Sequence, residues 1–382
     1  MDDPWVEDIL GEDFRALTLH LGPDDDGPRV ATLVAYEPLD GPAIPPAPGT
    51  GPQDDPPARA VLYLHGFSDY FFHRELAAAL HQRGWAFFAV DLHKYGRSLR
   101  PGQTPGFATS LDEYDADLEA AIAALGRRIA GRARPVPEDP APGSVDLVLM
   151  AHSTGGLTAA LWAARHPGRV AGLVLNSPWL ETQGSALLRS AAQGILDTVS
   201  RRRPKARLRL PELGFYFRSI SDTRDGEWPI DAAWRPEAGF PIRAGWLAAV
   251  LAGHAAVARG IAIDVPVLVL CSTASTLSTT WSDAMLRTDS VLDVSAMVRR
   301  AAELSHTVTI RRLQDALHDV FLSRSDVREQ AIDTVEWWLD ASVRPLRTAR
   351  ATPPVTGSDR RRTVGPLSER PSPQEDVRPA DA

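Results

Sequence analysis

The sequence has little of several features that define large classes of protein. Its 382 residues include a single cysteine, Cys271, so no internal disulfide framework is expected. No apolar run approaches the roughly 20 residues of a membrane span, and no stable membrane insertion is expected. Lysine and arginine number 41 against 49 acidic residues, and the net charge of −8 offers no basic field to attract nucleic acid. The sequence also lacks internal repeats, CxxC pairs, an HExxH motif and a phosphate-binding glycine loop, so neither metal nor organic cofactor is expected.

The overall composition is that of an ordinary globular chain. Hydrophobic residues make up 44% and charged residues 24%. The length suits one large α/β domain with an insertion, or two modest domains. Residues 1–4 (MDDP) are acidic and no apolar signal-peptide core follows them, so the expected location is cytoplasmic.

The order of apolar segments predicts the fold class. Residues 13–20 and 30–36 alternate between apolar and polar side chains and indicate an antiparallel hairpin at a sheet edge. Near-continuously apolar strands then alternate with helix-like segments, for example residues 60–64 and 86–90. This rhythm predicts an α/β fold, with a mostly parallel central sheet covered by helices on both faces, over a domain of residues 1–345.

Two segments depart from that rhythm. Residues 177–263 are irregular and rich in aromatic residues, and their position between two strands predicts a lid over the ligand-binding end of the sheet. Most of these aromatics are expected to pack in the insertion's own core, with Trp179, Trp228 and Trp246 facing substrate. Residues 346–382 have scarcely a large apolar side chain and are predicted to be disordered.

The candidate nucleophile lies in residues 147–156 (LVLMAHSTGG), which read as a strand, a sharp turn and a helix with Ser153 at the tip. Such a turn strains the backbone and admits only small neighbours, hence the usual G-x-S-x-G spelling. Here Ala151 replaces the first glycine, while Gly155 and Gly156 leave room for the helix. The stretch alone also fits a buried junction whose serine only caps the helix, so other residues must decide.

A nucleophilic serine needs a base, and in such folds the chain order is serine, acid, histidine. His318 lies in the loop between the last expected strand and the closing helix, which is where the base must lie. The other downstream histidines are less suitable: His166, His254, within the predicted lid, and His306, at the wrong end of a strand.

The acid and the oxyanion donors complete the prediction. No carboxylate directly follows the strand that ends near Cys271, and the first candidates are Asp283, Asp289 and Asp293. We favour Asp289, with Asp293 second. For the oxyanion hole the sequence predicts the backbone N–H groups of Thr154, after the nucleophile, and Phe67, in the turn after an earlier strand.

Together these stretches resemble α/β-hydrolases of the serine aminopeptidase S33 or monoacylglycerol lipase (lysophospholipase)-like group. The resemblance covers about residues 10–342 and is carried by residues 65–71 (HGFSDYF), 91–98 (DLHKYGRS), 151–156 (AHSTGG) and 318–319 (HD). Two departures stand out. Lys94 and Tyr95 occupy arginine and glycine positions of the family's D-x-R-G-x-G-R-S motif. The family's G-x-x-D-x-V acid motif usually comes just after the strand, but here its match, residues 289–291 (DSV), lies farther along the chain.

The resemblance implies a serine hydrolase that cleaves carboxylic esters through an acyl-enzyme. The aromatic lid favours hydrophobic acyl chains, so a monoacylglycerol, lysophospholipid or similar small ester is the expected partner. Two alternatives stay open. An aminopeptidase or amidase of the same fold would need lid carboxylates for the substrate's ammonium group, and a non-catalytic binding protein would follow if the late acid failed to support His318. The lid's candidate carboxylates are Glu181, Asp222, Asp225 and Glu227.

Overall fold

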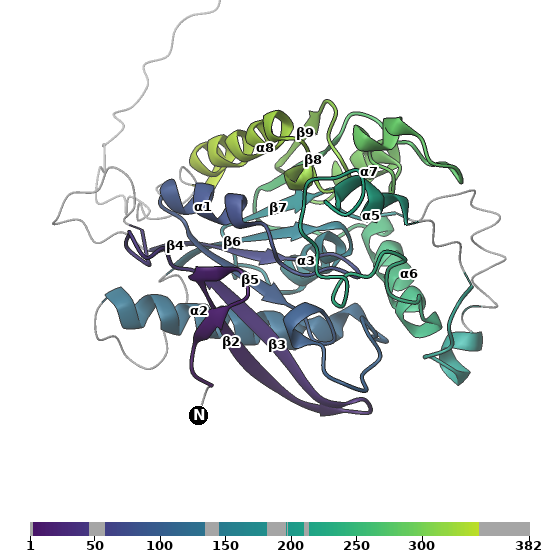
Figure 1. Ribbon diagram of the computed structural model, residues 1–382, viewed down its shortest axis with the longest axis horizontal. Helices are drawn as coiled ribbons and strands as arrows, with labels where there is room; N and C mark the ends of the chain where they lie inside the picture. Colours follow the sequence, from purple (N-terminus) through teal and green to yellow (C-terminus); the bar gives the residue numbers. More distant parts are fainter. Residues whose placement is uncertain are drawn as a thin grey trace, which may run out of the picture.

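The computed structural model describes residues 3–45, 58–133, 145–181, 196, 198–209 and 214–343 (Figure 1). The predicted disordered tail, residues 346–382, lies outside this range, as does part of the predicted lid. The described residues form a nine-stranded sheet in the order β1-β2-β3-β5-β4-β6-β7-β8-β9. Its strands are β1 (Val6–Asp8), β2 (Gly11–Asp24), β3 (Gly27–Tyr36), β4 (Ala58–Leu64), β5 (Ala86–Asp91), β6 (Val145–His152), β7 (Gly172–Asn176), β8 (Val267–Ser272) and β9 (Val308–Leu313).

The sheet has an antiparallel edge and a parallel body. The strands β1, β2, β3 and β5 pair antiparallel in that order, and every pair from β5 through β4 to β9 is parallel. The predicted edge hairpin is therefore present as β2 and β3, with the short β1 added outside it. The parallel body agrees with the near-continuously apolar strands, because both faces of a parallel sheet are covered.

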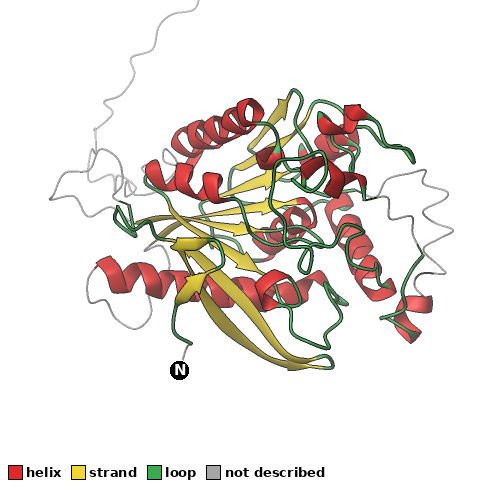
Figure 2. Ribbon diagram, in the orientation of Figure 1, coloured by secondary structure: helices red, strands yellow, loops and turns green. Residues whose placement is uncertain are grey.

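Helices cover both faces of the sheet, as predicted (Figures 1 and 2). In β6, Leu147, Leu149 and Ala151 belong to the core shared with α2 and α3, whereas Val148 and Met150 belong to the core shared with α1 and α8. The alternation follows from the two-residue repeat of a strand. The helices are α1 (Arg74–Gln82), α2 (Asp115–Ala133), α3 (Ser153–Arg165), α5 (Phe215–Ile220), α6 (Ala244–Ala258), α7 (Val294–Ala301) and α8 (Ser325–Trp338).

The segment between β7 and β8 carries α5 and α6 and starts at the carboxyl end of the sheet. Its aromatic residues do not mainly form a core of their own, contrary to the expectation. Trp234 packs against Tyr70, with ring centroids 5.2 Å apart, and Trp246 packs against Phe67 at 3.9 Å. Trp234 and Trp246 therefore pack against the loop after β4 and not in a separate core of the insertion. The described part of the insertion is thus joined closely to the body of the domain.

Candidate active site

Ser153 lies at the tip of a tight turn between β6 and α3. Its φ of 52° falls in the left-handed region, which a non-glycine residue adopts only when its surroundings hold it there. The helix α3 approaches the loop after β4 so closely that a Cβ on Gly155 would lie 2.2 Å from the carbonyl oxygen of His65. Ala151, which replaces the usual first glycine, is fully buried in β6, so its methyl group forms part of the core. The local structure is the strained strand-turn-helix that the sequence predicted.

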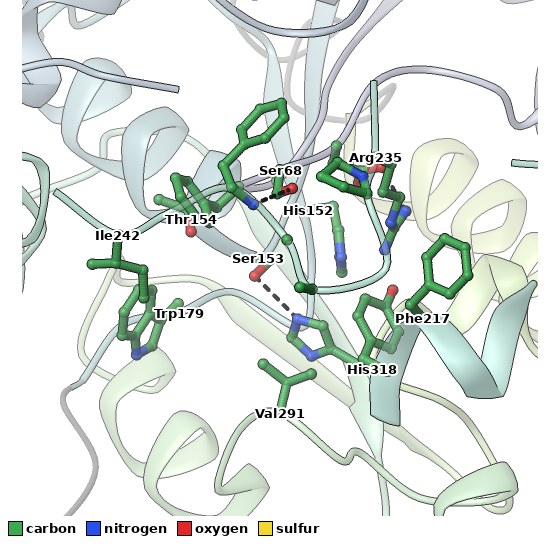
Figure 3. Close-up of a pocket in the computed structure, with 18 of the residues that line it drawn as sticks. Ser68, His152, Ser153, Thr154, Trp179, Phe217, Arg235, Ile242, Val291 and His318 are labelled. Carbon is green, nitrogen blue, oxygen red and sulfur yellow. Dashed lines mark hydrogen bonds and ion pairs between the residues drawn. The ribbon is translucent and has the colours of Figure 1, made fainter. Parts of the chain in front are cut away.

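The structure brings Ser153, His318 and Asp289 into one hydrogen-bonded chain. The Ser153 Oγ lies 3.0 Å from His318 Nε2 (Figure 3), and His318 Nδ1 lies 2.9 Å from Asp289 Oδ2. The other carboxylate oxygen of Asp289 accepts hydrogen bonds from the backbone N–H groups of Val291 and Leu292, at 2.8 and 2.7 Å. A carboxylate only accepts, so His318 Nδ1 carries the proton and Nε2 faces the serine hydroxyl as an acceptor.

Asp289 reaches this position by a detour of the chain. The strand β8 ends at Ser272, and the following loop includes a 3₁₀ turn over Asp283–Leu286 before it returns. The Asp289 N–H then donates to the Ala274 carbonyl at 3.0 Å, and the Thr276 N–H donates to the Asp289 carbonyl at 2.8 Å. The late acid of the sequence therefore lies beside the residues that directly follow β8.

The other acid candidates have different partners. Asp293 is the N-cap of α7, where its side chain accepts from the backbone N–H groups of Ser295 and Ala296 at 2.9 and 3.1 Å. Asp283 begins the 3₁₀ turn of the detour. This arrangement favours Asp289 as the group that orients His318.

The predicted oxyanion donors flank Ser153. Phe67 follows Gly66, whose Cβ position would lie 3.1 Å from the Ser153 Cβ, so this loop passes directly over the nucleophile. Thr154 is in the first turn of α3, where backbone N–H groups have no partner within the helix. Both residues line the cavity that contains Ser153 and His318.

This cavity has a volume of about 500 Å³ and two chemically different sides. Trp179 and Ile242 lie on one side of Ser153, and Arg235 and Phe217 lie on the other (Figure 3). The Trp179 side is apolar, because the Trp246 ring lies 6.2 Å from the Trp179 ring and 3.9 Å from the Phe67 ring, whereas the other side combines Phe217 with the charged Arg235. The apolar lining residues include Phe67, Trp179, Phe240, Ile242 and Trp246, and the polar ones include Ser68, Asp69, Tyr216, Arg235 and Glu237.

Trp179 and Trp246 thus line the cavity, but Trp228, the third predicted substrate-binding residue, does not. The indole N–H of Trp228 donates to the Leu322 carbonyl at 2.8 Å, and its ring packs near Phe72. This tryptophan is partly buried and packs against the body of the domain. Composition alone could not distinguish this packing from a role in the cavity.

Two lining residues that the sequence analysis did not select form a buried ion pair. Arg235 Nη1 lies 2.6 Å from Asp69 Oδ1, and the two residues are only 5% and 1% exposed. Burial alone would lower the pKa of Arg235, but Asp69 raises it above its ordinary value, so Arg235 stays charged. Asp69 belongs to the HGFSDYF stretch, whereas no sequence pattern distinguishes Arg235 within the irregular insertion.

A second buried group lies behind His318. Asp319 accepts from His73 Nε2 at 2.9 Å and from Asn176 Nδ2 at 2.6 Å, and it is fully buried. Burial would raise the pKa of Asp319, but His152 and His73 hold it well below its usual value. Burial lowers the pKa of His152 to about 4, so the neighbour of the nucleophile is neutral at pH 7. These residues fix the loop that carries His318.

The described residues hold neither a metal-binding cluster nor a membrane-spanning helix. They contain no cluster of three or more histidine, cysteine, aspartate or glutamate side chains placed to hold a metal ion. Within the same ranges, no helix has the length and apolar character required to cross a membrane.

Comparison with solved structures identifies the fold. The monoacylglycerol lipase of Paleococcus ferrophilus superposes with a TM-score of 0.53 at 21% identity, covering 74% of this chain and 94% of the lipase. A soluble variant of the monoglyceride lipase of Saccharomyces cerevisiae gives a TM-score of 0.51 at 16% identity, covering 85% and 96% of the two chains. At such low identities the likeness shows the fold alone, and that fold is the α/β-hydrolase fold, as predicted.

Sequence comparison gives the family. Residues 55–322 match the family described as serine aminopeptidase, S33, and the chain belongs to this family. The chain is also similar to a non-heme haloperoxidase of Rhodococcus erythropolis, with 35% identity over 121 residues. That match spans 31% of this chain and only 36% of the haloperoxidase. The prediction of a serine hydrolase is confirmed at the level of the family.

Proposed function

We propose that this protein is a carboxylic ester hydrolase that acts on small esters with hydrophobic acyl chains. The observation that carries the proposal is the hydrogen-bonded chain from Ser153 through His318 to Asp289, at 3.0 and 2.9 Å, beside a largely apolar cavity. Nucleophilic acyl transfer needs this combination of an activated hydroxyl, an oriented base and a binding site for an apolar group.

In the proposed mechanism Ser153 Oγ attacks the ester carbonyl while His318 Nε2 takes the hydroxyl proton. The Asp289 carboxylate keeps the proton of His318 on Nδ1 and stabilises the imidazolium that forms. The N–H groups of Phe67 and Thr154 stabilise the oxyanion. His318 then protonates the leaving alcohol, and water, activated by the same histidine, releases the acid and restores Ser153.

The acyl group is assigned to the side of the cavity formed by Trp179, Ile242 and Trp246, because these side chains offer apolar area near the nucleophile. The leaving alcohol then lies towards Arg235 and Asp69. Monoacylglycerols and lysophospholipids are the first substrates to test.

The geometry gives less support to the two alternatives. The cavity is not lined by the four lid carboxylates considered for binding a substrate ammonium group: Glu181, Asp222, Asp225 and Glu227. A different lid carboxylate, Glu237, does line the cavity, but it pairs with Arg224 at 2.9 Å. Glu181 lies 3.6 Å from Arg300, and Asp225 pairs with Arg218. The binding-protein alternative required an acid loop that fails to support His318, and the return of Asp289 beside Ala274 removes that argument.

The proposal is tested by hydrolysis of p-nitrophenyl esters of increasing chain length, compared with aminoacyl anilides. We expect turnover of the esters, with a preference for chains longer than acetate, and little turnover of the anilides. Ser153→Ala should abolish the activity. A folded protein that cleaves anilides faster than esters, or whose ester hydrolysis survives Ser153→Ala, would contradict the proposal.

A further inference from the structure

The predicted lid includes a segment whose contacts are those of a fixed wall. We call residues 231–242 the wall segment and residues 65–72 the oxyanion loop. The two run against each other beside Ser153, and both contribute residues to the cavity.

Three consecutive residues of the oxyanion loop each bind a different residue of the wall segment. Ser68 Oγ accepts from the Phe240 N–H at 2.9 Å (Figure 3). Asp69 pairs with Arg235 at 2.6 Å. The hydroxyl of Tyr70 accepts from the backbone N–H of residue 231 at 2.9 Å.

Two properties of the oxyanion loop make these contacts necessary. Ser68, directly after the proposed donor Phe67, has a φ of 52° in a buried position, a conformation that costs of order 1 kcal/mol or more and persists only where neighbours impose it. Asp69 is buried, so the loss of Arg235 would leave an unpaired charge in the interior.

The opposite end of the oxyanion loop is attached to the sheet. The Phe71 N–H donates to Asp91 Oδ1 at 2.9 Å, and Arg97 Nη1 donates to the Phe71 carbonyl at 3.0 Å. The loop is therefore held between β5 on one side and the wall segment on the other. Displacing the wall segment would release one of the two supports of the oxyanion hole.

We propose that the wall segment is a fixed positioning element, in which Arg235 acts through Asp69 to hold the Phe67 N–H in place, and that it stays closed throughout turnover. This inference rests on the proposed function for the meaning of the oxyanion hole. It goes beyond that function because the wall segment is then part of the catalytic support, and substrate reaches Ser153 without displacing it.

A reversible cross-link tests whether the wall segment opens. A Cβ on Gly239 would lie 3.9 Å from the Ser68 Cβ, within the usual 3.5–4.5 Å range of a disulfide. In the double variant Ser68→Cys/Gly239→Cys, oxidation ties the two segments together and reduction releases them. Gly239→Cys places a side chain on a backbone with a φ of +70°, and Ser68→Cys removes the hydroxyl that accepts from the Phe240 N–H. Both effects are present in either redox state. We expect ester turnover of the two states to agree within about twofold. A loss of tenfold or more on oxidation that is recovered on reduction would overturn the proposal.

A second variant tests the positioning role of Arg235. Arg235→Met should lower kcat by about 100-fold and change KM less than threefold, because oxyanion donors act on the transition state. Arg235→Lys, which keeps the charge, should recover part of the loss. Arg169→Met is the matched control: it breaks an Arg–Glu pair of the same 2.6 Å length that is exposed and remote from the cavity. A changed KM with unchanged kcat in Arg235→Met would contradict a positioning role.

Hydrogen exchange separates this inference from the proposed function. Amides of residues 67–71 should exchange faster in Arg235→Met than in Arg169→Met, whether or not the protein is active. Equal exchange in the two variants would overturn the bracing role. If the unmodified protein hydrolyses no ester, the proposed function fails, and the exchange comparison still decides whether the wall segment supports the loop.

Discussion

The backbone N–H of Asp289 donates a hydrogen bond to the carbonyl of Ala274, at 3.0 Å, although a loop with its own 3₁₀ turn separates the two residues. This bond places the acid beside the end of β8, where a catalytic acid of this fold is expected. The loop between them also contacts the insertion, because the Trp281 ring lies 4.0 Å from the Arg218 guanidinium carbon of α5. Asp289 thus comes late in the sequence because extra residues are inserted in the loop that carries it.

Replacing Asp289 should remove nearly all activity. Asp289→Asn keeps the shape but offers an amide to His318 Nδ1, which favours the wrong tautomer, and kcat should fall about 10³–10⁴-fold. Asp293→Ala is the control, since Asp293 caps α7; it should cost about 1 kcal/mol of stability and leave kcat within twofold. Steady-state kinetics and urea denaturation measure both effects. Equal activity losses in the two variants would contradict the assignment of the acid.

The close approach of α3 to the oxyanion loop predicts a second effect. A Cβ in Gly155→Ala would meet the His65 carbonyl oxygen at 2.2 Å, so the backbone must shift at the site of the oxyanion donors. We expect a loss of about 1–3 kcal/mol in the free energy of unfolding and a drop in kcat of at least tenfold. Gly131→Ala in α2, where nothing lies within 4 Å of the new Cβ, should leave kcat unchanged and raise stability by up to about 1 kcal/mol. Undiminished turnover in Gly155→Ala would show that the loop tolerates displacement.

Much of this site could be predicted from sequence because its signals are local or depend on chain order. Ser153 follows from the strand-turn-helix pattern, and His318 follows from its place between the last strand and the closing helix. The sequence of residues 289–291 (DSV) favours Asp289 as the acid, although its separation from β8 argues against it. The hydrogen bond to Ala274 that resolves this conflict joins residues with no shared local pattern.

The burial of His254 predicts how the free energy of unfolding changes as the pH falls. Burial lowers the pKa of His254 to about 4, and its Nε2 donates to the Trp179 carbonyl at 2.9 Å. The unfolded chain binds this proton near pH 6.5 and the folded protein does not, so stability falls as the pH drops from 6.5 towards 4. His254→Gln keeps a donor but cannot titrate. Between pH 7 and pH 5 the free energy of unfolding of this variant should fall by roughly 2 kcal/mol less than that of the unmodified protein, as measured by urea denaturation. An unchanged pH dependence would mean that His254 is protonated in the folded state.

Substitutions of two tryptophans test whether the acyl chain lies on the Trp179 side of the cavity. Trp179→Ala removes apolar surface beside Ser153, and kcat/KM for an octanoate ester should fall about tenfold while that for acetate changes less than twofold. Trp228→Phe loses the hydrogen bond to Leu322 and about 1 kcal/mol of stability, but the octanoate-to-acetate ratio should stay the same. A parallel loss for both esters in Trp179→Ala would place the acyl chain elsewhere.

The contrast between Trp179 and Trp228 also shows where prediction from sequence ends. Both lie in an irregular, aromatic-rich segment, and no periodicity says which face of the chain meets the cavity. Arg235 and Asp69 escape prediction for a related reason. Their pairing depends on two loops from distant parts of the chain, and neither loop has a regular geometry that would place its side chains.

The most direct test of a working Ser153 is its reaction with a fluorophosphonate probe, which labels an activated serine irrespective of the natural substrate. The purified protein is treated with the probe and the adduct is mapped by mass spectrometry, alongside His318→Ala and Asp293→Ala. We expect one adduct, on Ser153, which is lost in His318→Ala and retained in Asp293→Ala. A folded protein that remains unlabelled, or that labels equally well without His318, would contradict the proposed catalytic chain.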